Sequence, residues 1–150
     1  MRHQKFDTLL GATLSNKSLR ILIADEQHFQ RMRIERLFNQ LNYYRIAPVQ
    51  DLAELVNLVD YGCDPFDLVV INAQLAAGML DLPDFFVDNR HVHHAFIYNS
   101  PQVQLPTVVV GAQQTVQMSH AALPDLASIH RLMSKVDARL PSVGTVISVR

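Results

Sequence analysis

The sequence predicts an α/β fold in which helices cover both faces of a parallel β-sheet. Short apolar segments alternate with amphipathic ones along most of the chain. The apolar segments are continuous runs rich in Val, Ile and Leu, as expected of strands that are buried on both faces. The chain has 150 residues, of which 49% are hydrophobic and 18% charged. This length and composition favour one globular domain with a substantial core.

Charge and cysteine content exclude several classes of protein. The formal net charge of -1 argues against a dominant nucleic-acid or membrane-binding surface. The single cysteine, Cys63, excludes an intramolecular disulfide and a CxxC metal or redox site. No apolar run approaches the roughly 18–20 residues that span a bilayer, and the N-terminus has no apolar core typical of a secretory signal. We therefore expect a cytoplasmic protein that contacts no membrane.

The apolar segments predict five strands, and the amphipathic segments between them predict four helices. The predicted strands are 19–24, 44–49, 66–71, 94–98 and 115–119. The predicted helices are about 27–41, Asp51 to Gly62, Asp81 to Asn89, and about 124–138.

Residues at the helix ends support these bounds. Asp51 and Asp81 are suited to cap helix N-termini, whereas Asn42 follows a helix at a position that favours the left-handed conformation. In the last helix, Pro124 and Asp125 suit the first turn. Its predicted apolar stripe is Leu126, Ile129, Met133 and Val136.

Two segments compete for the fifth strand. Residues 107–110 and 115–119 are both extended in character, but only a few residues separate them. A parallel crossover needs roughly a dozen residues, and the stretch from Asn99 to Gln114 supplies them. The fifth parallel strand is therefore predicted at 115–119, which leaves 107–110 as an irregular or additional extended segment. Pro101 and Pro106 disfavour a regular helix there.

The chain ends are predicted to lie outside the domain. Residues 1–18 form an N-terminal arm, 19–140 form the domain, and 141–150 form a C-terminal tail. Within the tail, 145–149 is an alternative edge strand. No room remains after residue 138 for a typical DNA-binding domain, so we expect no direct DNA binding.

Two segments of the chain resemble the receiver domain of response regulators. Residues 21–33, with the sequence ILIADEQHFQRMR, resemble the first strand and helix of that family, together with Leu37 and residues 41–43. Residues 66–72, FDLVVIN, resemble its third strand. The resemblance covers about 19–138 and is carried by the part up to Tyr98. It implies a flavodoxin-like five-stranded parallel sheet flanked by helices, with the fourth helix replaced here by an irregular segment.

The resemblance also implies which positions carry the family's chemistry. In that family two acids after the first strand bind Mg²⁺, and an aspartate ending the third strand accepts a phosphoryl group. Here Asp25 and Glu26 match the acid pair, and Asn72 stands at the phosphoacceptor position. A carboxamide is a poor nucleophile and cannot form an acyl phosphate. Carboxylates suit Mg²⁺, which offsets charge on a transferring phosphoryl group.

Two further positions of the family pattern are altered. The hydroxyl position that ends the fourth strand falls at Asn99 or, one residue later, at Ser100. The lysine position falls near Ser119 and His120, where there is no lysine. These departures imply a degenerate receiver in a two-component (phosphorelay) pathway. It would not be an enzyme and would require no cofactor, but would act on a signalling partner or on itself.

Several alternatives remain open at this point. Asp25 and Glu26, with Asn72, could hold a weakly bound Mg²⁺, or the acids could only favour the N-terminus of the following helix. Asn72 could merely satisfy backbone groups in a tight loop. The chain could be a conventional phosphorelay receiver that uses another acid, Asp25 or Asp67. It could also be a small Mg²⁺-dependent hydrolase built on Asp25 and Glu26.

Other chemically active residues have simpler interpretations. His91, His93 and His94 resemble a metal cluster, but neighbouring residues of a strand point to opposite faces, so His93 and His94 should diverge. Cys63 is expected to be buried or inert. Three arginines interspersed with Glu35 indicate a solvated helix surface: Arg31, Arg33 and Arg36.

Overall fold

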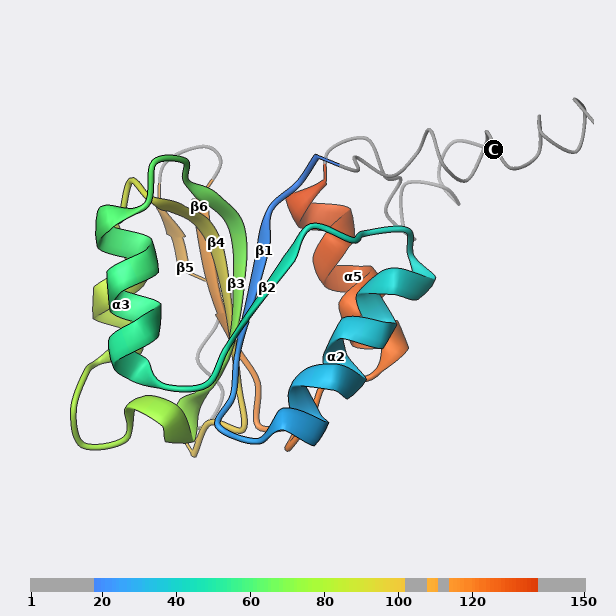
Figure 1. Ribbon diagram of the computed structural model, residues 1–150, viewed down its shortest axis with the longest axis horizontal. Coiled ribbons are helices and arrows are strands. Elements are labelled where there is room, and N and C mark those ends of the chain that lie inside the picture. The colour runs from blue at the N-terminus through green and yellow to red at the C-terminus, as the bar shows by residue number, and fades with distance from the viewer. Residues whose placement is uncertain (1–17, 102–107, 111–113, 138–150) are drawn as a thin grey trace, which may run out of the picture.

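The computed structural model describes residues 18–101, 108–110 and 114–137, and its centre is a six-stranded sheet (Figure 1). The order of the strands across the sheet is β2-β1-β3-β4-β6-β5. Their bounds are β1 Ile21–Ala24, β2 Ile46–Val49, β3 Phe66–Asn72, β4 Val92–Tyr98, β5 Val108–Val110 and β6 Gln114–Met118. All neighbouring strands are parallel except β5 and β6, which pair antiparallel. The five parallel strands have the flavodoxin-like order, with β6 as the fifth.

Helices cover both faces of this sheet, as predicted. Figure 1 shows α2 (His28–Gln40) and α5 (Leu126–Val136) on one face, and α3 (Leu52–Tyr61) and α4 (Leu82–Phe86) on the other. The side chains of β3 alternate between the two layers. Leu68 and Val70 belong to the core cluster under α2 and α5, whereas Val69 and Ile71 belong to the cluster under α3 and α4. The continuous apolar runs thus form strands buried on both faces.

The helix ends follow from local side chains. The Asp51 carboxylate accepts a hydrogen bond from the Glu54 amide at 2.8 Å, and the Asp81 carboxylate accepts one from the Asp84 amide at 3.1 Å. Asn42, just after α2, has a φ of 71°, as predicted. At Gly62, which ends α3, a Cβ atom would lie 2.5 Å from the carbonyl oxygen of Leu58. Glycine is therefore needed there for close approach of the backbone.

The bounds of α4 and of the strand after it differ from those predicted. Helix α4 ends at Phe86, so it is shorter than the helix predicted from Asp81 to Asn89. Instead, the Asn89 side chain accepts from the His91 amide at 2.9 Å and donates to the Phe85 carbonyl at 3.2 Å. These bonds stabilise a turn, and β4 consequently begins at Val92, ahead of the predicted residue 94.

Helix α5 differs in its start and in its buried face. Asp125 is the N-cap rather than a first-turn residue, because its carboxylate accepts from the Ser128 amide at 2.8 Å. Leu126, predicted to be in the core, is 39% exposed, whereas Leu132 is 2% exposed. The buried stripe therefore runs through Ile129, Leu132 and Met133, the helical spacing that faces the sheet below.

The connection between β4 and β6 resolves the competition for the fifth strand. Residues 114–118 form β6, parallel to β4, which confirms the predicted strand at 115–119. Residues 108–110 form an additional strand, β5, rather than an irregular segment. Antiparallel pairing explains why so short a connection joins β5 to β6. The described residues of this connection, 99–101 and 108–110, contain a strand and no helix.

Some predicted features lie outside the described residues. They are the N-terminal arm except Ser18, the C-terminal tail with its alternative edge strand, and residues 102–107 and 111–113. Among the described residues, no helix is both long enough and apolar enough to cross a membrane.

Candidate functional site

The carboxyl ends of β1, β3 and β4 bring three polar side chains together. Ala24 lies opposite Ile71, and Asn72 lies opposite Tyr98, so Asp25 falls into the same row. Side chains along a strand alternate between faces, and these three residues share the face that α2 and α5 cover. Strand register therefore makes neighbours of Asp25, Asn72 and Tyr98, which are far apart in sequence. We call these three residues the carboxyl-edge network.

Asp25 is the centre of the carboxyl-edge network and is 1% exposed. Its Oδ2 accepts hydrogen bonds from Asn72 Nδ2 at 3.0 Å and from the Tyr98 hydroxyl at 2.5 Å. Its Oδ1 accepts a hydrogen bond from the Gln27 amide at 2.9 Å. A buried carboxylate is costly unless donors surround it, and here three donors do so.

Asn72 has two roles at the end of β3. Its Nδ2 donates to Asp25, while its Oδ1 accepts from the Gln74 amide at 2.9 Å and from Asn99 Nδ2 at 3.1 Å. It therefore caps the short 3₁₀ helix η1 (Ala73–Ala76), as the loop interpretation expected. Asn99 lies directly after β4 and has a left-handed φ of 57°. Its hydrogen bond to Asn72 therefore links the loops that follow β3 and β4.

Tyr98 closes the carboxyl-edge network from β4. Burial raises the pKa of its hydroxyl, and the hydrogen bond to Asp25 and the negative charge of Asp25 raise that pKa further. The positive charge of Arg31 opposes this shift. Tyr98 therefore remains a proton donor to the carboxylate of Asp25 across the physiological pH range.

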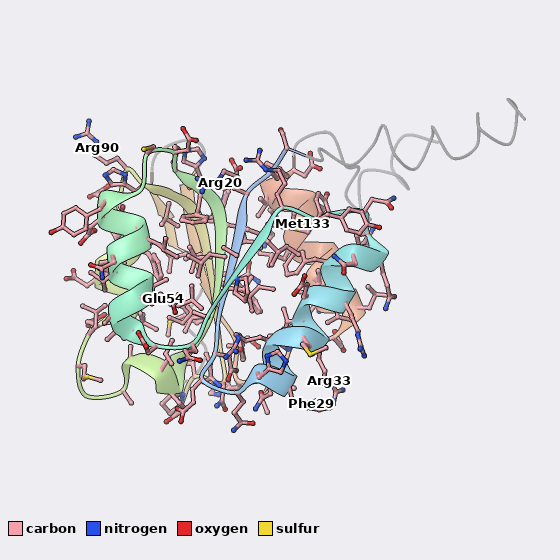
Figure 2. All side chains as sticks on the ribbon, viewed as in Figure 1. Arg20, Phe29, Arg33, Glu54, Arg90 and Met133 are labelled. Atoms are coloured by element: carbon pink, nitrogen blue, oxygen red, sulfur yellow. The ribbon has the colours of Figure 1, made fainter. Side chains whose placement is uncertain are left out.

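Arg31 does not belong to a solvated helix surface, contrary to the prediction. Its guanidinium donates to the backbone carbonyl of Asp25 at 2.7 Å, so α2 is tied to the end of β1. Arg33, by contrast, projects outward, as predicted, beside the exposed ring of Phe29 (Figure 2). The difference arises from helix phase, because only Arg31 lies on the side of α2 that turns toward the sheet.

The remaining predicted site residues are placed less centrally. Glu26 is exposed whereas Asp25 is buried, so the two acids of the predicted pair lie in different environments. Ser100 is 4% exposed, and its amide donates to the Ser119 carbonyl at 3.0 Å. The side chain of the other switch candidate, Asn99, donates to Asn72 Oδ1.

In this arrangement the oxygen atoms expected to bind Mg²⁺ face hydrogen-bond donors or solvent. Mg²⁺ demands several oxygen ligands in near-octahedral geometry. Both oxygens of Asp25 face hydrogen-bond donors, Asn72 presents its nitrogen to Asp25, and Glu26 points to solvent. Within 18–101, 108–110 and 114–137, no three His, Cys, Asp or Glu side chains are grouped so as to hold a metal ion.

The other candidate residues lie near the amino ends of the strands or in loops. Asp67, near the start of β3, accepts from the Arg20 amide at 2.8 Å and lies 3.4 Å from His93 Nδ1. His94 instead contacts Thr115 Oγ1 at 2.9 Å, so the two histidines diverge as predicted. Cys63 is exposed rather than buried, because it lies in the loop between α3 and β3.

Tyr98 is the member of the carboxyl-edge network that the sequence analysis did not predict. The signal was present in the strand pattern, because Tyr98 ends the fourth strand as Asn72 ends the third. Equal positions at the ends of parallel strands meet at one edge of the sheet. The prediction of a strand at 94–98 assigned no role to the side chain of Tyr98.

Comparison with protein-family models and with curated proteins finds no match to this chain. The assignment of a role therefore depends on the fold and on the carboxyl-edge network.

Proposed function

We propose that this protein is a cytoplasmic receiver-like signalling module of a two-component pathway, which acts by protein–protein interaction without aspartyl phosphorylation. It is not an enzyme in this proposal. The observation that carries it is the carboxamide of Asn72, which ends β3 and is hydrogen-bonded to Asp25 in a flavodoxin-like sheet.

The chemistry of the amide supports this role. Formation of an acyl phosphate needs a carboxylate nucleophile, and Asn72 has none. With an aspartate at this position, two carboxylates would meet within hydrogen-bond distance and would need a cation between them. The amide removes that repulsion by donating to Asp25 at 3.0 Å. Asn72 thus stabilises the buried acid while it removes the phosphorylation chemistry.

The proposed partner is a signalling protein or a second copy of the chain. We place the contact surface on the segment 99–122, on α5 and on the N-terminal and C-terminal tails. No Asp, Glu, Lys, Arg or His occurs from Ala95 to Ser119. Strand β5, which lies within this run, forms the edge of the sheet among the described strands. An uncharged edge strand favours pairing with another chain.

The experiment that tests the absence of phosphorylation is intact-mass measurement after treatment with acetyl phosphate and Mg²⁺. The proteins compared are the wild type, Asn72→Asp, and a matched control, Asn57→Asp, which adds the same charge on the exposed side of α3. We expect the wild type and Asn57→Asp to gain no phosphoryl group. A gain in Asn72→Asp alone would show that one residue disables the site.

A phosphorylated wild type would contradict the proposal. Peptide mapping would then show whether Asp25, Asp67 or another acid accepts the group. If no variant is labelled, the phosphorylation site is lost more widely, and the proposed binding role is retained.

A further inference from the structure

We infer that the Tyr98 hydroxyl and the Asn72 carboxamide satisfy the buried carboxylate of Asp25, so that this end of the sheet is closed to Mg²⁺. The inference deepens the proposed function, on which it rests, because it makes the module independent of metal as well as of phosphate. It also names Tyr98 as the residue that positions Asp25.

The first step concerns how the charge of Asp25 is satisfied. Asp25 is 1% exposed, and its two oxygens accept three hydrogen bonds from Gln27, Asn72 and Tyr98. A buried polar group is tolerated in the core when hydrogen-bond donors satisfy it. The protein's own hydrogen-bond donors therefore satisfy the buried carboxylate of Asp25, as a bound cation would otherwise do.

The second step concerns Tyr98, which would have to leave before a cation could approach. Its hydroxyl lies 2.5 Å from Asp25 Oδ2, and its ring is fully buried in the core cluster under α2 and α5. Binding of Mg²⁺ to Asp25 would break a short hydrogen bond and displace a packed aromatic side chain.

The third step concerns Asn72, whose side-chain amide is held in one orientation by hydrogen bonds to both its nitrogen and its oxygen. Its nitrogen is bonded to Asp25, and its oxygen accepts from the Gln74 amide and from Asn99. Turning its oxygen toward a cation would break all three bonds. The carboxyl-edge network thereby joins the ends of β1, β3 and β4 and holds the following loops in one arrangement.

The test begins with the full-length wild type and MgCl₂ alone. Calorimetric titration and thermal unfolding are measured in millimolar MgCl₂ and in NaCl of equal ionic strength. We expect no heat of binding and no difference in melting temperature between the two salts. Mg²⁺ binding by the wild type that is lost in Asp25→Asn would overturn the inference.

Variants then test whether these donors are the cause. In Asn72→Asp/Tyr98→Phe a second carboxylate replaces the amide, and the hydroxyl is removed. We expect MgCl₂ to raise the melting temperature of this variant by several degrees. We also expect it to bind Mg²⁺ at least tenfold more tightly than the wild type does. Asn72→Asp/Tyr61→Phe is the matched control, because Tyr61 is 81% exposed and distant in the fold. We expect this control variant to gain less Mg²⁺ affinity than the double variant, since the Tyr98 hydroxyl still donates to Asp25.

The outcomes separate this inference from the proposed function. If a folded double variant gains no Mg²⁺ binding, or gains no more than the control, the donors are not what excludes the cation and the inference is wrong. If the double variant does not fold, the wild-type titration still decides. A wild type that binds Mg²⁺ but is not phosphorylated overturns this inference alone, whereas a phosphorylated wild type overturns the proposed function.

Discussion

At the scale of single residues, the carboxyl-edge network depends on one short contact. The Tyr98 hydroxyl donates to the carboxylate of Asp25, and both side chains are buried. Hydrogen bonds to charged groups contribute more than neutral ones, and a buried carboxylate left short of donors is costly. Tyr98 should therefore matter more for stability than its aromatic ring alone accounts for.

We predict that Tyr98→Phe lowers the free energy of unfolding by about 1.5–3 kcal/mol, the range for hydrogen bonds to charged groups. The ring and its packing are retained, so the loss reports on the hydroxyl. Urea unfolding at neutral pH measures it. Tyr61→Phe is the control and should leave stability unchanged, because Tyr61 is 81% exposed. Equal stability of the two variants would contradict the prediction.

The raised pKa of Tyr98 also predicts how stability depends on pH. In the unfolded chain a tyrosine loses its proton near pH 10, whereas in the folded protein Tyr98 keeps it to higher pH. The folded state then binds more protons than the unfolded state, so the contribution of Tyr98 is complete below about pH 10 and is lost as the pH rises above it. The stability difference between wild type and Tyr98→Phe should shrink in that range. A constant difference would argue against the raised pKa.

At the scale of secondary-structure elements, α5 shows how packing determines which side of a helix is buried. Its sequence offers two leucines, Leu126 and Leu132, which are six residues apart and so lie about a third of a turn apart around the helix. The sheet and α2 lie against the middle of the helix, so Leu132 is buried and Leu126, in the first turn, is not. Its start is held by reciprocal hydrogen bonds between Asp125 and Ser128.

We predict that Leu132→Ala lowers the free energy of unfolding by about 2–5 kcal/mol, because the truncation leaves a cavity in the core. Leu126→Ala removes the same atoms from a 39% exposed side chain and should cost less than about 1 kcal/mol. Chemical unfolding of the two variants measures the difference. A larger loss of unfolding free energy in Leu126→Ala than in Leu132→Ala would contradict the burial of Leu132 in the core.

At the scale of the whole molecule, the protein has two core layers and a formal net charge close to zero. The two layers of apolar side chains lie on opposite faces of the sheet, so α2 and α5 are separated from α3 and α4 (Figure 1). With a formal net charge of -1, repulsion between copies is weak. One described edge of the sheet, β2, contains Pro48, which cannot donate to a further strand, whereas β5 consists of three valines.

If the partner is a second copy, the mass from size-exclusion chromatography with light scattering should rise with concentration. Val109→Lys in β5 should reduce that rise, because charges on an edge strand oppose edge-to-edge pairing. Ala53→Lys, at an exposed position of α3, adds the same charge elsewhere and should not reduce it. A mass that is independent of concentration would contradict self-association and leave a different signalling protein as the proposed partner.

The sequence by itself determined the elements and their order, because these depend on short-range patterns. Continuous apolar runs identify the strands, and side chains such as Asp51 and Asp81 act on backbone groups only three residues away. The same patterns place Asp25 and Asn72 at strand ends and therefore at one edge of the sheet. The pairing of 108–110 was harder to predict, since a short extended segment can be an edge strand or an irregular loop.

Only the tertiary structure decided which groups surround Asp25. Asn72 and Tyr98 come from strands that are distant in sequence, and the register of those strands brings their side chains to one carboxylate. Whether Arg31 turns inward and Glu26 outward depends on how α2 packs on the sheet. Such choices depend on long-range packing and on competition among donors for a buried charge, which no local pattern of residues contains.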